Sequence, residues 1–170
     1  MSKIPYGRQY IDKSDSVIVR NSLKENLITT GKFVKKFEEK LSNFFKVRNA
    51  ITCNSGTAAL HLAFMAADLK KNDVVIMPAV NFISAYNMCS QLGAKIYLAD
   101  VDKTTGQMTP NLLLDCIRNN TIKKIKLILT MYMGGYQDKL FQFYQIKQKY
   151  DIFINNMIYT NCEFNRLQNL

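Results

Sequence analysis

Short apolar runs alternate with amphipathic stretches along most of the chain. The runs at residues 50–53, 74–77, 95–99, 125–131 and 152–154 have the length of buried strands, and the stretches at 57–68, 82–91, 111–118 and 140–150 have helical spacing. This alternation predicts an α/β fold with a mostly parallel sheet and helices on both faces. Ligands in such sheets bind beyond the carboxyl ends of the strands, so we expect the functional residues there.

Two helices are predicted before the first strand. One begins at Ser14 or Asp15 as its N-cap and continues to Glu25. After a loop at 26–31, the second covers 33–45, where apolar residues recur every three or four positions. That spacing puts one face of the second helix on a core.

The composition predicts a folded domain, and the first residues predict a protein that stays inside the cell. The chain has 170 residues, 48% of them hydrophobic, with only 3 Pro and 7 Gly, which predicts one domain or a piece of a larger one. The longest apolar run, 58–67, is too short to cross a membrane, and the first fifteen residues lack the apolar region of an export signal. We therefore expect a cytoplasmic protein with no membrane partner.

The spacing of the cysteines and the distribution of the basic residues argue against metal-binding, disulfide-rich and nucleic-acid-binding proteins. The 4 Cys are spaced singly, so neither a metal site nor a disulfide framework is expected. The net charge of +10 is concentrated in the first and last fifty residues. Within the second helix, Lys32, Lys35, Lys36 and Lys40 follow the pattern of a solvated face, so nucleic acid is not an expected partner. A small molecule that carries phosphate remains compatible with this charge.

The segment Asn54-Ser55-Gly56-Thr57 is the most informative local feature, because it lies between a predicted strand and a predicted helix. A helix start offers unpaired backbone N–H groups, Gly56 allows an anion to approach them, and Ser55 and Thr57 add hydroxyl groups. The segment is therefore either a phosphate cradle or an ordinary N-cap.

Three other features are open to two interpretations. Phe82 follows a predicted strand and is either a core residue or an aromatic ring at the ligand-bearing edge. Asp100 and Asp102 end another strand, where they could act as acids and bases or cap a turn. His61 is the single histidine and has no partner for a metal site, so we interpret it as a packed helix residue.

Six segments in a fixed order resemble the DegT/DnrJ/StrS family of sugar-nucleotide aminotransferases that depend on pyridoxal phosphate (PLP). They are IPYGRQYID at 4–12, LITTGKFVKKFEEKL at 27–41, NSGTAALHLAF at 54–64, MPAVNFISAYN at 77–87, GAKIYLADVD at 93–102 and MGGY at 133–136. Within the family, the chain looks most like enzymes that aminate precursors of nonulosonic acids. The resemblance implies the large domain of a type I PLP-transferase, an α/β/α sandwich, in a homodimer.

The resemblance also implies roles for particular residues. Ser55, Gly56 and Thr57 would hold the PLP phosphate, Phe82 would stack on the pyridine ring, and Asn156 would face the ring nitrogen. The reaction implied is amino transfer from a donor such as glutamate to a 4-keto sugar nucleotide, in the synthesis of cell-surface polysaccharide or nonulosonic acid. The sugar nucleotide would be lined by Tyr6, Asn26, Leu27, Ile28 and Thr29.

Two differences from the family bear on activity. Asn155-Asn156 stands where relatives carry Glu-Asp, and no lysine follows Lys149. In the family the lysine that binds PLP covalently lies further along, so we expect it to be missing here; no catalytic residue is assigned, and PLP is expected to be bound non-covalently at best. We expect an incomplete or inactive fragment, with the alternative of a non-catalytic module that binds phosphate or PLP or forms a heterodimer.

The expected organisation has three parts. Residues 1–31 are the N-terminal helix and substrate loop, 32–154 are part of the large domain, and 155–170 are a divergent tail that is polar and rich in asparagine. The small C-terminal domain of the family is expected to be absent.

Overall fold

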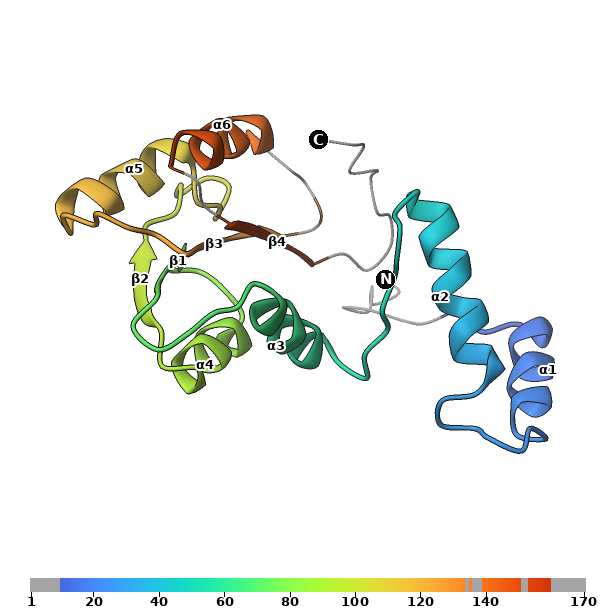
Figure 1. Cartoon of the computed structure of the whole chain (residues 1–170). Coiled ribbons are helices and arrows are strands. Elements are labelled where there is room, and N and C mark those ends of the chain that lie inside the picture. Colours follow the sequence, from blue (N-terminus) through green and yellow to red (C-terminus); the bar gives the residue numbers. More distant parts are fainter. Residues whose placement is uncertain (1–9, 134, 136–138, 151–152, 160–170) are drawn as a thin grey trace. The chain divides into compact units, whose positions relative to one another are not determined.

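The computed structural model describes residues 10–133, 135, 139–150 and 153–159. Within this part, the residues up to Thr52 form one compact unit and those from Cys53 onward form a second. Figure 1 labels the helices and strands of both.

Helix α1 (Lys13–Ser22) has Asp12 as its N-cap, so the prediction of Ser14 or Asp15 at that position was wrong. The Asp12 carboxylate accepts hydrogen bonds from the backbone N–H of Ser14 at 2.7 Å and of Asp15 at 3.1 Å, and the Asp15 carboxylate accepts from the Asp12 N–H at 2.9 Å. This reciprocal pair is a capping box. Hydrogen bonds from the Ser14 side chain and from the two N–H groups lower the pKa of Asp12. The helix also ends before Glu25, the expected last residue.

Helix α2 (Lys32–Phe45) ends at Lys46, which adopts a left-handed conformation with φ of 53°. Beyond it, the strand predicted at 50–53 does not form. The Glu38 carboxylate instead accepts from the backbone N–H of Thr52 at 2.9 Å and from its hydroxyl at 3.0 Å. A side chain of α2 therefore takes the donor that a neighbouring strand would have used.

The second unit contains a four-stranded parallel sheet in the order β2-β1-β3-β4, which confirms the predicted sheet type. Its strands are β1 (Val74–Pro78), β2 (Lys95–Ala99), β3 (Leu127–Met133) and β4 (Phe153–Tyr159). Its helices are α3 (Gly56–Ala66), α4 (Ile83–Gln91), α5 (Pro110–Asn119) and α6 (Leu140–Tyr150).

Alternate residues of the central strands pack on opposite faces of the sheet. Ile76 and Ile128 join a core cluster with residues of α5 and α6, whereas Val75 and Leu127 join another with residues of α3 and α4. Figure 1 shows the same division, with α3 and α4 on one side of the strands and α5 and α6 on the other. The second unit is thus an α/β/α sandwich, as the sequence predicted.

Strand β4 is longer than expected at its carboxyl end. It was predicted to end at Ile154 but continues to Tyr159, while Ile152 lies outside the described residues. Asn155 pairs with Leu129 and Asn156 with Thr130 in the parallel ladder. The paired asparagines are therefore part of the sheet.

Cys53, Cys89 and Cys116 are free thiols in the described part of the chain. Cys89 lies in the core between α3, α4 and the sheet. Burial raises the pKa of its thiol from 9.0 to about 12.

Raising the pH is expected to weaken the second unit through Cys89. The folded state keeps a proton that the unfolded chain loses, so this contribution to the free energy of unfolding is intact below pH 9 and falls as pH rises from 9 to about 12. Urea denaturation at about pH 7.5 and about pH 10.5 measures the loss. Cys89→Ala is expected to lose less stability over this range than the unsubstituted chain, and equal losses would contradict the assignment to Cys89.

None of the helices in the described ranges is long and apolar enough to cross a membrane. In the same part of the chain, no group of three or more His, Cys, Asp or Glu side chains is arranged to hold a metal ion.

Candidate functional site

The start of α3 carries the predicted phosphate cradle. Ser55 is the N-cap, and its Oγ accepts a hydrogen bond from the backbone N–H of Ala58 at 3.1 Å. The Ser55 carbonyl accepts from the N–H of Ala59 at 3.0 Å. Ser55 therefore acts as a cap, and its hydroxyl hydrogen remains able to donate.

The next two residues supply the unused donors. Among the described residues, no partner accepts a hydrogen bond from the backbone N–H of Gly56 or Thr57. A Cβ added to Gly56 would meet no atom within 4 Å, so the space beside these donors is open. Two free N–H groups at the positive end of a helix are suited to an anion such as a phosphate.

The loop between β1 and α4 carries the predicted ring-stacking residue. Phe82 is 56% exposed and is the N-cap of α4, so the interpretation of Phe82 as a core residue is wrong. The preceding residue, Asn81, is a feature that the sequence analysis missed. Both polar atoms of its amide are buried, and neither has a hydrogen-bond partner among the described residues.

The α3 cradle and the β1–α4 loop belong to the same edge of the sheet. Helix α3 is joined to β1 by a short connection, residues 67–73, and packs its buried Leu60 and Phe64 against strand residues. It therefore runs back alongside β1 and begins near the carboxyl end of that strand, where Asn81 and Phe82 follow. The topology thus brings two of the predicted site segments to one edge.

The predicted substrate loop lies between α1 and α2 in the first unit. A hollow of about 400 Å³, here called the loop hollow, is lined by Asn26 and Leu27 and by further residues of the loop and of α2. Ile28 and Thr29 are exposed and are not among the residues that line it. Tyr6 lies outside the described residues.

The other candidate residues are one asparagine in β4 and two aspartates after β2. Asn156 is in β4, where only its backbone is described. Asp102 caps a turn, since its carboxylate accepts from the N–H groups of Thr104 at 3.0 Å and Thr105 at 2.9 Å. These bonds lower the pKa of Asp102, that from Thr105 contributing most. The cap interpretation of Asp102 is therefore confirmed, whereas Asp100 accepts, within the described residues, only from the N–H of the next residue, Val101, at 2.8 Å.

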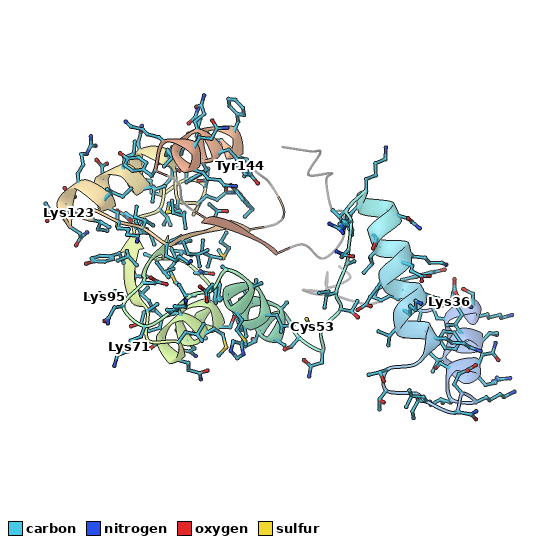
Figure 2. The ribbon with its side chains drawn as sticks, in the orientation of Figure 1. Lys36, Cys53, Lys71, Lys95, Lys123 and Tyr144 are labelled. Carbon is cyan, nitrogen blue, oxygen red and sulfur yellow. The ribbon has the colours of Figure 1, made fainter. Side chains whose placement is uncertain are left out.

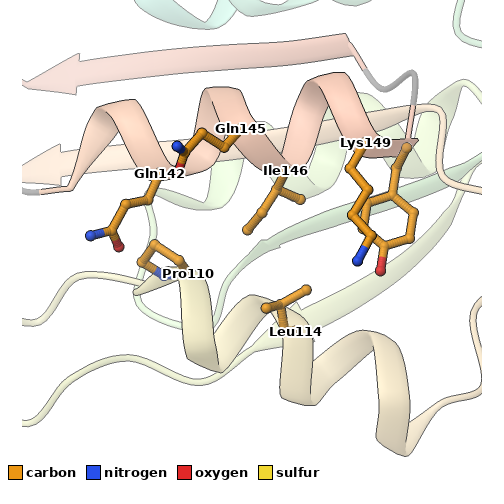
Figure 3. A pocket seen from close by; sticks show the side chains of 7 residues that line it. Pro110, Leu114, Gln142, Gln145, Ile146 and Lys149 are labelled. Atoms are coloured by element: carbon orange, nitrogen blue, oxygen red, sulfur yellow. The ribbon is translucent and has the colours of Figure 1, made fainter.

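A second hollow of about 290 Å³ lies between α5 and α6 (Figure 3). Its apolar lining comes from Pro110, Leu114 and Ile146. Its cation, Lys149, is placed near the ring of Tyr150, with 5.6 Å between the ammonium and the ring centre. None of the predicted site residues lines this hollow.

The described residues fit two parts of PLP. The free N–H groups of Gly56 and Thr57 suit its phosphate, and the exposed ring of Phe82 suits a flat aromatic face. The resemblance assigns the pyridine nitrogen to Asn156, whose side chain is not among the described ones, so this part of the fit is left to the proposal below.

The chain is similar in sequence and in structure to several known enzymes. The chain is 32% identical over 149 residues to the UDP-4-amino-4,6-dideoxy-N-acetyl-beta-L-altrosamine transaminase of Campylobacter jejuni. The aligned residues make up 88% of this chain and 39% of that enzyme. The GDP-4-keto-6-deoxy-D-mannose-3-dehydratase of E. coli, solved with bound hydrated PLP, aligns with a TM-score of 0.82 at 25% identity over 92% of this chain and 41% of that one.

An aminotransferase from Psychrobacter cryohalolentis has the same fold, with a TM-score of 0.77 at 22% identity, over 89% of this chain and 38% of that one. The chain thus spans about 40% of the length of the relatives it matches. The family model described as the DegT/DnrJ/EryC1/StrS aminotransferase family matches residues 9–156. The chain belongs to this family.

Proposed function

We propose that this chain provides the cofactor cradle and substrate loop of a PLP-dependent enzyme that transfers an amino group to a 4-keto sugar nucleotide. The observation that carries the proposal is the pair of free N–H groups at Gly56 and Thr57, beside an open space and on the same sheet edge as Phe82. The relative from Campylobacter jejuni is named as a transaminase of a UDP-linked amino sugar, which supports a sugar nucleotide as the substrate.

In this proposal, the chain's own residues bind the phosphate of PLP and orient its ring. The N–H groups of Gly56 and Thr57 and the hydroxyl of Ser55 hold the phosphate, and Phe82 fixes the plane of the ring. Bound PLP would supply an electron sink for amino transfer. Glutamate is the proposed donor, and the pathway is the synthesis of cell-surface polysaccharide or nonulosonic acid in the cytoplasm.

A homodimer is also proposed. Several large apolar side chains on α3 and on the start of α4 are exposed, and an exposed apolar face on a folded domain is suited to a protein partner. They are Leu62, Met65, Ile83 and Tyr86.

The second candidate is a binding module without turnover. It is favoured by the Asn155-Asn156 pair within β4, because an amide cannot replace a carboxylate beside a protonated ring nitrogen. Such a module would bind PLP or another phosphate compound and would pair with a different chain.

One experiment separates the two candidates. The full chain is loaded with PLP, the bound PLP is measured by equilibrium dialysis, and 2-oxoglutarate is measured after glutamate and a 4-keto sugar nucleotide are added. Bound PLP with 2-oxoglutarate supports the transaminase and overturns the expectation that the chain is inactive. Bound PLP without 2-oxoglutarate supports the binding module, and absence of bound PLP contradicts both.

Replacing Phe82 with alanine is expected to weaken PLP binding by about 3- to 10-fold, because an aromatic stack contributes about 0.5–1.5 kcal/mol. The melting temperature is expected to change little, since Phe82 is 56% exposed. Val80→Ala is the matched control, because Val80 lies in the same loop between β1 and α4 and is 44% exposed. Equal effects of the two substitutions on PLP affinity would contradict the stacking role.

A further inference from the structure

Asn81 lies in the loop between β1 and α4, directly before Phe82, and the amide of its side chain is buried. Neither Nδ2 nor Oδ1 has a hydrogen-bond partner in the part of the chain that the structure describes. An amide can donate two hydrogen bonds and accept two, so a buried amide without any of them costs free energy. Buried side-chain amides in folded proteins are nearly always paired. The loop as described is therefore less stable than one in which this amide is paired.

The rest of this loop is held by few interactions. The side chain of Phe82, the N-cap of α4, makes no capping hydrogen bond, whereas Ser55 and Thr109 cap α3 and α5 through their hydroxyl groups. Val80 and Phe82 are also exposed, so they bury little apolar surface. A segment with few hydrogen bonds and little burial rearranges more readily than the core. The loop can thus shift while α4 stays attached to the sheet by buried residues further along the helix.

The burial of the Asn81 amide decides how it can act on a ligand. Both of its polar atoms are covered by the protein, so a ligand does not reach them in this arrangement. The next residue, Phe82, is exposed on the same sheet edge as the cradle at the start of α3, which follows Cys53 in Figure 2. A covered group beside a residue that contacts the ligand can affect binding by setting the position of that residue.

We propose that Asn81 is a positioning residue, whose amide is unpaired in the ligand-free loop and forms hydrogen bonds within the chain when the loop settles on bound PLP. This inference rests on the proposed function, since PLP is the ligand on which Phe82 would stack. Any ligand that binds more tightly to the paired arrangement shifts the loop toward it. In that arrangement the amide holds Phe82 against the ring and takes no part in amino transfer.

Asn81→Leu removes the amide and keeps the branching of the side chain. The urea midpoint of the ligand-free chain is expected to be unchanged or higher, because the substitution removes a buried polar group that has no partner among the described residues. PLP affinity, measured by equilibrium dialysis of the full chain, is expected to fall about 3- to 10-fold, the range expected for loss of the Phe82 stack. Asn87→Leu is the matched control, because it makes the same change at an exposed residue of α4. It is expected to change PLP affinity by less than about twofold.

Two further readouts separate positioning from a general effect on the fold. In the Phe82→Ala background, Asn81→Leu is expected to weaken PLP binding by less than about a further twofold, because the residue that Asn81 positions is already gone. PLP that is held in one orientation acquires a circular dichroism band, and at saturating PLP this band is expected to be smaller in Asn81→Leu than in Asn87→Leu. Asn81→Ser, which keeps a donor and an acceptor, is expected to recover part of the affinity and of the band.

A lower urea midpoint in both Asn81→Leu and Asn81→Ser would overturn the proposal, because the amide would then be paired in the ligand-free state, by the chain or by a buried water. Unchanged PLP affinity in Asn81→Leu would overturn it as well, and so would a further loss of about 3- to 10-fold in the Phe82→Ala background. In each of these cases, PLP binding by the unsubstituted chain would leave the cofactor cradle in place. An unsubstituted chain that binds no PLP would overturn the proposed function together with the role of Asn81.

Discussion

Replacing Gly56 with aspartate is expected to weaken PLP binding by about 100-fold or more, because it puts a carboxylate beside the phosphate donors. The free N–H groups of Gly56 and Thr57 lie at the positive end of α3. Two hydrogen bonds to a charged group contribute about 1.5–3 kcal/mol each, and about 1.4 kcal/mol corresponds to a factor of ten in affinity. The introduced carboxylate would both repel the phosphate and compete for its donors.

The same substitution is expected to leave the free energy of unfolding nearly unchanged. A Cβ at position 56 meets no atom within 4 Å, and an acidic residue in the first turn of a helix interacts favourably with the helix dipole. Asn111→Asp is the matched control, since it adds one negative charge in the first turn of α5. PLP affinity is measured by equilibrium dialysis, and stability by urea denaturation.

Equal PLP affinities in Gly56→Asp and Asn111→Asp would contradict the placement of the phosphate at α3. A large loss of stability in Gly56→Asp would contradict the open space beside Gly56. Gly56→Ala is a useful intermediate, because it adds a methyl group to the cradle without adding charge.

The sheet could be predicted where apolar runs are flanked by helical patterns, as with β1 and β3. The run at 50–53 has the same apolar character but forms no strand, and the Thr52 backbone N–H is bonded to the Glu38 side chain. Conversely, Asn155 and Asn156 look unlike a buried strand, yet they pair with β3. In both cases the backbone partner is distant in sequence, and periodicity does not report such partners.

Some residues of the candidate site could likewise be predicted from the sequence, and others could not. Residues 55–57 could be singled out from the sequence because a helix start places its donors locally. Asn81 could be noticed only from the burial of its amide, since an asparagine before an aromatic residue has no distinctive pattern.

Replacing Phe64 with alanine is expected to lower the free energy of unfolding of the second unit by about 3–5 kcal/mol, the usual cost of removing a buried phenyl ring. Phe64 is 0% exposed and packs in the cluster that attaches α3 and α4 to the sheet, together with Leu60, Val75 and Met77. Phe141→Ala is the matched control, because it removes the same ring from a residue of α6 that is 63% exposed. Its substitution is expected to cost no more than about 0.5 kcal/mol.

Phe64→Ala is expected to lower stability and keep PLP affinity, whereas Gly56→Asp is expected to keep stability and lower PLP affinity. The first substitution removes the attachment of α3 to the sheet, and the second changes the phosphate donors at its start. Phe64 is eight residues beyond Gly56 on the same helix, so its removal leaves the N–H groups of the cradle in place. The folded fraction of Phe64→Ala is therefore expected to bind PLP within about threefold of the unsubstituted chain, measured well below its melting temperature. A loss of affinity as large as that of Gly56→Asp would indicate that the cradle depends on core packing and would contradict a site formed locally by the start of α3.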